Sequence, residues 1–210
     1  MIRFKDREEA GKKLAHLLKE YKNRQDTIIL GLARGGVVTA AVLAHELALP
    51  LDVVVVRKIG APDNEELAIG AITEHGVHVF NEVLIKQVGV AQTYIDATVA
   101  REREECEKRE KLYRTHKSAV DITGKTVILV DDGIATGLTM EAAVKDVRKR
   151  GAHKVVVAVP VMPADVVDSL KQLCDELIYL IAPEHFLAIG AFYTDFAQVN
   201  HDKVIKVLKQ

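Results

Sequence analysis

Cysteine is scarce in this chain of 210 residues, and neither sign of charge is in excess. The only two cysteines, Cys106 and Cys174, lie far apart and outside any C-x-x-C or Cys/His metal spacing. We therefore expect free thiols and no structural metal. The 29 basic and 30 acidic residues leave a net charge of −1, which provides no overall field to attract nucleic acid or an anionic membrane. Any anion-binding site must be local.

Long hydrophobic runs and the common nucleotide-binding motifs are also missing. No run approaches the roughly 18 to 20 apolar residues that a membrane span needs, and residues 1–10 lack the apolar core of a signal peptide. These absences predict a cytoplasmic protein without a membrane partner. Neither G-x-x-x-x-G-K-[ST] nor G-x-G-x-x-G occurs, which argues against a Walker-type nucleoside triphosphatase and against a dinucleotide-dependent dehydrogenase.

Short apolar runs rich in β-branched residues alternate with helical stretches along most of the chain. The predicted strands are 27–32, 51–56, 126–130, 154–159 and 176–181, and the predicted helices are 7–21, 37–49, 139–150, 163–173 and 203–208. Nearly continuous apolar strands separated by helices indicate an α/β fold with a parallel sheet covered on both faces. With 49% hydrophobic residues, the chain can bury a sizeable core as one domain over 1–210.

Residues of about 60–124 break this alternation, because the gap between strands is much longer than an ordinary crossover. The gap contains a predicted hairpin that turns near His75 and Gly76, followed by a charged helical segment over 101–117. In that segment acids repeatedly precede bases by four residues, an order that stabilises a solvated helix. The interleaved signs favour a surface helix over a nucleic-acid patch. We interpret the whole gap as an insertion in the domain.

The stretch VILVDDGIATGLTM, residues 127–140, predicts a phosphate site at the end of a buried strand. Gly133 and Gly137 let the backbone turn tightly and bring its N–H groups close to a bound anion. Thr136 and Thr139 add hydroxyl donors at the start of the following helix. The stretch therefore has the composition of a phosphate cradle.

Two acids stand directly before this loop. Asp131 and Asp132 would repel a phosphate that faced them, but ionised carboxylates are acceptors that suit the vicinal hydroxyls of a sugar. A ribose 5-phosphate would satisfy both parts of the stretch. The structural alternative is that Asp132 merely caps the helix.

Two further loops follow predicted strands, where ligands of open parallel sheets bind. The motif LARGG comes after the first strand, and its Arg34 can bind phosphate oxygens through two parallel N–H groups. Gly35 and Gly36 leave room for backbone contacts with the same group. Arg57 and Lys58 follow the second strand, where they could bind an anion or remain a solvated basic pair.

Residues 127–140 resemble the phosphoribosyl diphosphate (PRPP) signature of type I phosphoribosyltransferases, in which an apolar strand, two acids and a T-G-x-T loop follow one another. The similarity covers most of the chain. It makes LARGG the pyrophosphate loop and makes the segment beyond the Arg-Lys pair the mobile loop that closes over PRPP. It implies the type I phosphoribosyltransferase fold with an inserted hairpin, a charged helix and a small C-terminal hood over about 182–200. The implied PRPP-binding residues are Arg34, Gly35, Gly36, Arg57, Lys58, Asp131, Asp132, Gly133, Ile134, Ala135, Thr136, Gly137, Leu138 and Thr139.

The resemblance also implies an activity, the transfer of ribose 5-phosphate from PRPP to a nucleobase-like nitrogen with release of diphosphate. Asp131 and Asp132 would stabilise an oxocarbenium-like ribose, and Arg34 and Lys58 would neutralise the leaving diphosphate. Mg²⁺ would be carried mainly on substrate oxygens. Family members suggest a homodimer. The alternative is a regulatory protein that binds PRPP or a nucleotide without catalysis.

The hood completes the implied site. In purine-specific members it stacks the base on an aromatic ring, and here Phe186 takes that place unless it belongs to the core. Backbone groups of Leu187 and Ala188 would read the base edge. Asp195 would bind a water of Mg²⁺, although its spacing departs from the family pattern by one residue. Ala135 stands where oxopurine transferases carry Asp, which argues against hypoxanthine or guanine as acceptor.

Overall fold

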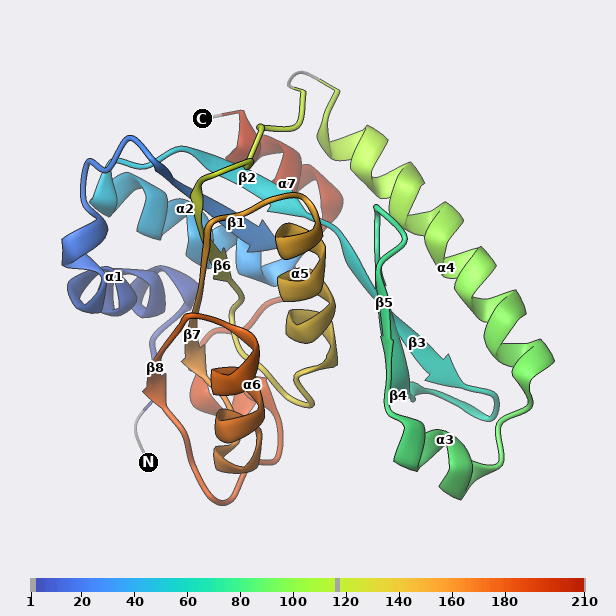
Figure 1. Cartoon of the computed structure of the whole chain (residues 1–210). Coiled ribbons are helices and arrows are strands. Elements are labelled where there is room, and N and C mark those ends of the chain that lie inside the picture. Colours follow the sequence, from blue (N-terminus) through green and yellow to red (C-terminus); the bar gives the residue numbers. More distant parts are fainter. Residues whose placement is uncertain (1–2, 116–117, 210) are drawn as a thin grey trace.

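A parallel sheet of five strands forms the centre of the protein (Figure 1). The computed structural model describes residues 3–115 and 118–209. The strands run in the order β2-β1-β6-β7-β8, and each neighbouring pair is parallel. Their bounds are Thr27–Leu32 for β1, Leu51–Val54 for β2, Thr126–Val130 for β6, Lys154–Val161 for β7 and Glu176–Ile181 for β8. The predicted parallel sheet is confirmed.

Helices cover both faces of this sheet because its central strands are apolar on both sides. The covering helices are α1, Arg7–Leu17, and α2, Gly35–Leu47, on one face, and α5, Leu138–Lys149, and α6, Val167–Leu173, on the other. The side chains of successive β6 residues point to opposite faces of the sheet, as in any β-strand. Ile128 packs with Leu14 and Leu43, whereas Leu129 packs with Met140.

Several helix boundaries differ from those that the sequence predicts. The first predicted helix splits into α1 and a 3₁₀ turn at Lys19–Tyr21, and the fourth into a 3₁₀ turn at Ala164–Val166 and α6. Helix α7, His201–Leu208, begins two residues early because the Asn200 side chain caps it by accepting the Lys203 N–H. No helix in the described part of the chain is both long enough and apolar enough to cross a bilayer.

A second, antiparallel sheet of three strands stands beside the main sheet (Figure 1). Its strands are β3, Val56–Ala61, β4, Asn64–Thr73, and β5, His78–Phe80, and α3, Glu82–Val88, follows them. The predicted hairpin is confirmed, since β4 pairs with β5 and Gly76 takes a positive φ of 77° in the turn. Strand β3 was not predicted. The sequence pattern suggests one strand over 51–56, whereas the chain leaves the main sheet at Val55 and starts β3 directly afterwards.

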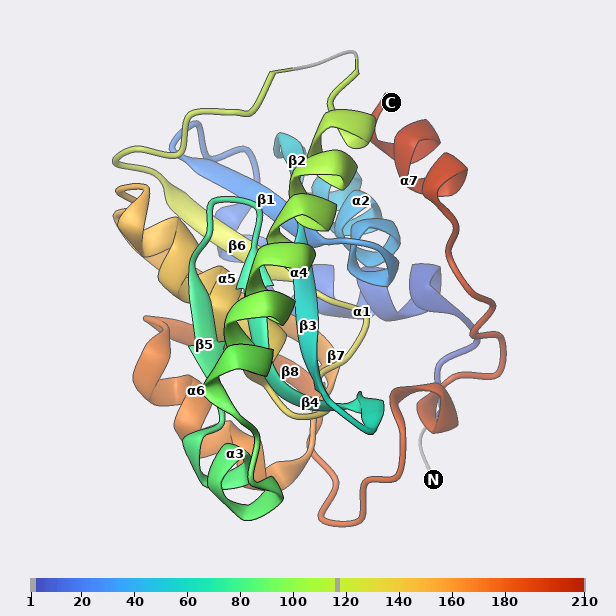
Figure 2. The ribbon, with the colours of Figure 1, turned by 90° about the vertical axis from the view of Figure 1, so that its right-hand side faces the viewer.

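The charged segment belongs to a long helix, α4, Gln92–Tyr113, that packs along the second sheet (Figure 2). Its predicted i, i+4 ion pairs form at Glu104–Lys108, Glu105–Arg109 and Glu110–Arg114, whereas Glu107 pairs with Arg103. The helix is nevertheless not a purely solvated one. Ile95, Glu102, Cys106 and Tyr113 are buried on its inner face, and both cysteines of the chain are free, as predicted. Residues 116–117 of the predicted segment lie outside the described residues.

The hood packs against the N-terminal segment. Phe4 donates its N–H to the Phe192 carbonyl oxygen at 2.8 Å and forms a parallel bridge with Tyr193. These three side chains are buried together with Val161 at the end of β7. The N-terminus therefore anchors the hood beside the carboxyl ends of the parallel strands.

Candidate functional site

The acid pair lies directly against the start of α2. A Cβ atom on Gly35 would stand 2.0 Å from Asp132 Oδ2, and one on Gly36 would stand 2.8 Å from the Cα of Asp131. Only glycine allows this approach, so the structure joins two loops that the sequence predicts separately. Burial and the negative charge of the neighbouring Asp132 raise the pKa of Asp131.

Asp132 is held by contacts with the N-terminus and the hood that no motif indicates. Arg7 Nε donates to Asp132 Oδ2 at 2.7 Å, and each of the two side chains is 11% exposed. The Arg7 guanidinium covers the Phe196 ring at 3.9 Å from the ring centroid. Tyr193 stacks on Phe196 and donates its hydroxyl to the Asp132 carbonyl oxygen at 2.6 Å. Asp132 does not cap α5, whose N-cap residue is Gly137.

The loop after the acid pair opens α5 without a side-chain cap. Gly137 has a φ of 83° and caps the helix with backbone alone, so the N–H groups of the first turn stay open to a ligand. Ala135 and Thr136 are exposed, and Thr139 is half-buried. These three residues line a cavity of about 240 Å³ that also contains Gly133.

Two residues of the predicted loop point elsewhere. Ile134 is buried in the core and donates its N–H to the Val161 carbonyl oxygen at 2.9 Å. Leu138 is buried in the same cluster. In this structure neither the side chain of Ile134 nor its N–H faces the cavity, so its predicted contact with PRPP has no support from the geometry. Leu138 can contribute only its backbone N–H in the first turn of α5.

The predicted cations enter the site from two elements. Arg34 stands at the N-cap of α2, after a cis Ala33–Arg34 peptide bond. Lys58 is exposed on β3 and lines the same small cavity as Arg34. Arg57 is also on β3, but its Nε donates to Glu102 Oε2 of α4 at 2.6 Å. The Arg-Lys pair thus lies on a strand, rather than in a loop as the sequence suggests.

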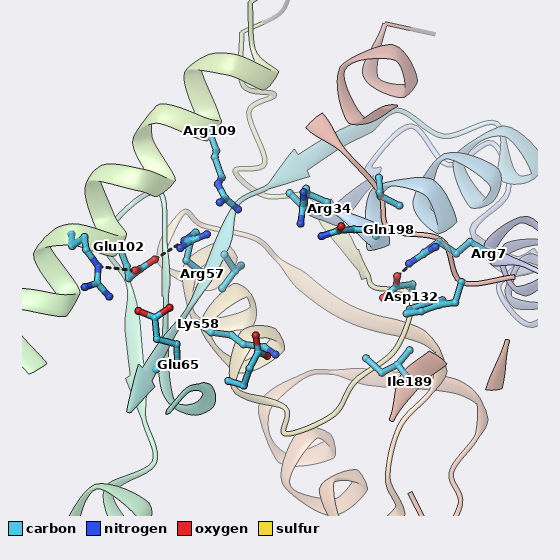
Figure 3. Close-up of a pocket in the computed structure, with 18 residues that line it drawn as sticks. Arg7, Arg34, Arg57, Lys58, Glu65, Glu102, Arg109, Asp132, Ile189 and Gln198 are labelled. Atoms are coloured by element: carbon cyan, nitrogen blue, oxygen red, sulfur yellow. Dashed lines mark hydrogen bonds and ion pairs between the residues drawn. The ribbon is translucent and has the colours of Figure 1, made fainter. Parts of the chain in front are cut away.

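A larger cavity of about 640 Å³ adjoins the small one and shares Arg34, Gly35, Lys58 and Asp132 with it (Figure 3). Its volume falls in the range of small-molecule sites. Its wall comes from α1, β3, α4 and the hood, and its charged or polar lining residues include Arg7, Arg57, Glu65, Arg101, Glu102, Arg109 and Gln198. Helix α4 therefore forms part of the candidate site.

The predicted hood residues do not line these two cavities. Phe186 stacks on Phe192 inside the hood, with ring centroids 5.6 Å apart, and Leu187 is 95% exposed. Ala188 is also exposed and lies outside both linings. Ile189 and other residues further along the hood turn inward instead, and the base-stacking role of Phe186 stays a prediction.

Asp195, the predicted metal residue, also lies elsewhere. It accepts the Ala197 N–H at 3.1 Å and lines a separate surface cavity with Asp6 and Lys203. The structure does not place it beside the acid pair. Its carboxylate shapes a turn of the hood.

The residues that the sequence did not indicate are Arg7, Glu102, Arg109, Ile189, Tyr193, Phe196 and Gln198. None belongs to a motif, and Arg7 meets Asp132 across 125 residues of chain. Only the aromatic richness of the hood could have drawn attention to Phe196.

Residues 3–173 match the phosphoribosyl transferase domain family. The chain belongs to this family. It is 40% identical over 205 residues to Rv0571c of Mycobacterium tuberculosis (strain ATCC 25618 / H37Rv), a protein named provisionally as a phosphoribosyl transferase; the alignment covers 98% of this chain and 46% of Rv0571c. The chain thus spans about half the length of that relative. It is also 34% identical over 143 residues to an amidophosphoribosyltransferase of Staphylococcus aureus (strain MRSA252), covering 66% of this chain and 27% of that enzyme.

Solved structures agree with this assignment. The crystal structure of TT1426 from Thermus thermophilus shares 42% sequence identity and a TM-score of 0.81, covering 99% of this chain and 98% of TT1426. A purine phosphoribosyltransferase from Pyrococcus horikoshii has the same fold at 22% identity and a TM-score of 0.50, with 92% of each chain covered. The predicted type I phosphoribosyltransferase fold is confirmed. The homodimer and the cytoplasmic location stay predictions.

Proposed function

We propose that this phosphoribosyltransferase domain transfers ribose 5-phosphate from Mg²⁺-bound PRPP to a nitrogen of a nucleobase-like or amine acceptor. The observation that supports this best is the meeting of three groups around adjoining cavities: the uncapped start of α5, the acid pair and the Arg34–Lys58 cations. Their order matches the parts of PRPP, with an anion at each end of a sugar. The smaller cavity would take the ribose 5-phosphate, and the larger one the diphosphate and the acceptor.

Each group would have a separate role in the transfer. Backbone N–H groups from Ala135 to Thr139 would bind the 5-phosphate, and Asp131 and Asp132 would accept hydrogen bonds from the ribose hydroxyls. As the C1–O bond to diphosphate breaks and the C1–N bond forms, the carboxylates would stabilise positive charge on the ribose, and Arg34 and Lys58 would stabilise the leaving anion. The acceptor N–H proton would leave to water.

The residues present fit Mg²⁺ that arrives with the substrate. Within residues 3–115 and 118–209, no group of three or more His, Cys, Asp or Glu side chains is arranged to enclose a metal ion. Mg²⁺ keeps most of its water and binds through few carboxylates plus substrate phosphates. Asp131 at the rim of the small cavity could hold such a water. Bound Mg²⁺ would neutralise charge on the diphosphate.

Diphosphate release tests the proposal. The full chain is incubated with PRPP and Mg²⁺ and a panel of nucleobases and amines, and diphosphate is measured by a coupled assay. We expect release that depends on one class of acceptor and produces the matching ribonucleotide by mass spectrometry. Tight PRPP binding without release on any compound would overturn the transfer reaction and favour the regulatory alternative.

Replacement of Thr136 by valine is expected to raise the dissociation constant for ribose 5-phosphate about 10-fold. Thr136 is exposed beside the open end of α5, and a hydroxyl bond to a charged phosphate contributes about 1.5 to 3 kcal/mol. Isothermal titration of both proteins with ribose 5-phosphate measures the change. Thr194→Val, at an exposed hood position outside both cavities, serves as the control. Equal affinities of Thr136→Val and wild type would contradict the phosphate role of this loop.

A further inference from the structure

We propose that Arg7 recognises the acceptor by donating hydrogen bonds to it. The acceptor would be a planar nitrogen compound that turns an oxo or carboxylate oxygen toward the hood. This inference rests on the proposed transfer reaction. It concerns the end of the larger cavity that we propose for the acceptor, where the structure places Arg7, Ile189 and Gln198 (Figure 3). Phe196 lines the same end, whereas the sequence predicts Phe186 there.

Arg7 is held in one orientation by three contacts, one with the acid pair and two with neighbouring residues of the hood. Its Nε donates to Asp132, its Nη1 donates to the Ala197 carbonyl oxygen at 2.9 Å, and its guanidinium plane covers Phe196. Phe196 is itself stacked with Tyr193. A side chain fixed in this way loses little further entropy when it binds a ligand.

Most of the hydrogen-bonding capacity of Arg7 remains unused. A guanidinium has five N–H donors, and the described residues accept from two of them, one on Nε and one on Nη1. The side chain is 11% exposed and lines the cavity, and no Arg7 nitrogen is among the buried, unpartnered side-chain atoms of the described residues, so its remaining donors are open to a ligand there. A ligand in the cavity would supply the missing acceptors.

The chemistry of these donors selects an oxygen over an amino group. Guanidinium nitrogens donate and cannot accept, so an amino group placed against them would leave donors facing donors. An oxo or carboxylate oxygen satisfies them. Asp132 already balances the charge of Arg7, so a neutral carbonyl is sufficient. Ile189, Phe196 and Val199 supply apolar wall for a planar ring, and the Gln198 amide can either donate or accept.

Matched ring pairs test the proposal on the full chain. The probes are hypoxanthine with adenine, 2-pyridone with 2-aminopyridine, and 2-aminobenzoate with 1,2-diaminobenzene. Dissociation constants are measured by isothermal titration with saturating ribose 5-phosphate and Mg²⁺, conditions under which no transfer occurs. In the wild type we expect the oxygen-bearing member of at least one pair to bind about 10-fold more tightly.

Two Arg7 variants and one control test whether the Arg7 side chain causes this preference. Arg7→Met should remove the preference for oxygen, whereas Thr194→Val, at an exposed hood position outside both cavities, should keep it. Arg7→Lys keeps a positive charge beside Asp132 without the planar fork, and it should weaken the preference even if Arg7→Met fails to fold. A preference for oxygen that persists in the folded Arg7 variants, tighter binding of the amino members, or no binding of any probe would overturn the proposal.

The same panel distinguishes this inference from the proposed reaction. If the wild type releases diphosphate only with the amino-bearing compound of each pair, the proposed transfer reaction is supported and the proposed role of Arg7 is wrong. If the oxygen-bearing probes bind through Arg7 and no diphosphate is released, the proposed role of Arg7 is supported and the proposed transfer reaction is wrong.

Discussion

Gly35→Ala is expected to lower kcat/KM for PRPP about 100-fold with little loss of stability. The new Cβ would lie 2.0 Å from Asp132 Oδ2 and 2.7 Å from its Cγ, so the carboxylate must swing away from the proposed ribose site. This movement also breaks the bond to Arg7, and displacements of about 1 Å in a reacting complex can cost 10²-fold. Helix α2 itself tolerates alanine at its first position, because alanine is the best helix former. Diphosphate-release kinetics and thermal melting give the two readouts.

The adjacent Gly36→Ala provides a matched contrast. There the added Cβ would lie 2.7 Å from the Val130 carbonyl oxygen and 2.8 Å from the Cα of Asp131, which are backbone atoms that cannot rotate away. Helix α2 must then separate from β6, a form of overpacking that costs about 1 to 3 kcal/mol. We expect a clear fall in Tm for Gly36→Ala and a much smaller one for Gly35→Ala. Wild-type kinetics in Gly35→Ala would rule out Asp132 as a ribose ligand.

Glu74→Gln is expected to make the free energy of unfolding less dependent on pH. In the wild type, ionisation of Glu74 should lower this free energy by up to about 3 kcal/mol as pH rises from 5 to 8, and the glutamine variant should lack this contribution. The Glu74 side chain is fully buried, and its Oε1 has no hydrogen-bond partner among the described residues. Its Oε2 accepts the Val55 N–H at 3.0 Å, at the single residue that joins the two sheets. Burial raises the pKa of Glu74 to about 7.

The sign follows from the two protonation states. Since the folded pKa lies above the unfolded value near 4.5, the protonated form is favoured in the folded protein, and stability falls as pH rises between about 4.5 and 7. Asp146 lies near Glu74 and has a lowered pKa, which places its own effect below this window. His75 contacts Asp146 and has a raised pKa, so its deprotonation also lowers the stability of the folded protein as pH rises. Glu110 and Arg150 are the other charged groups of this network.

Urea unfolding at pH 5 and pH 8 measures the difference for wild type and Glu74→Gln. We expect the pH dependence to shrink in Glu74→Gln without vanishing, since His75 still titrates. The exposed Glu184→Gln should retain the wild-type dependence. An unchanged slope in Glu74→Gln would show that Glu74 is ionised at pH 5 in the folded protein.

Local patterns were enough to predict the parallel sheet and one edge of the site. Strands β1, β6 and β8 begin and end at their predicted residues because their apolar runs are bounded by polar residues or turns. The acid pair and LARGG follow neighbouring strands, and parallel strands bring their carboxyl ends to the same edge. The approach of Gly35 to Asp132 follows from that topology.

The same reasoning failed where a continuous apolar run changes partner. Residues 51–56 carry no turn residue, yet Val55 leaves the main sheet and β3 pairs with β4. Arg57 and Lys58 therefore lie on a strand. Nothing in the run itself distinguishes these two pairings, because both sheets bury valine equally well.

The amino-acid sequence by itself determined the resemblance to the family, the acid pair after a buried strand and the glycine- and threonine-rich loop that follows it, because these depend on residues close together in the chain. Only the tertiary structure decided that Arg7 holds Asp132, that Glu102 on α4 holds Arg57, and that Phe186 stays inside the hood. Such contacts join segments that are distant in the chain, up to 125 residues apart for Arg7 and Asp132. Their partners are set by how helices and hood pack on the sheets, and no local periodicity records that packing.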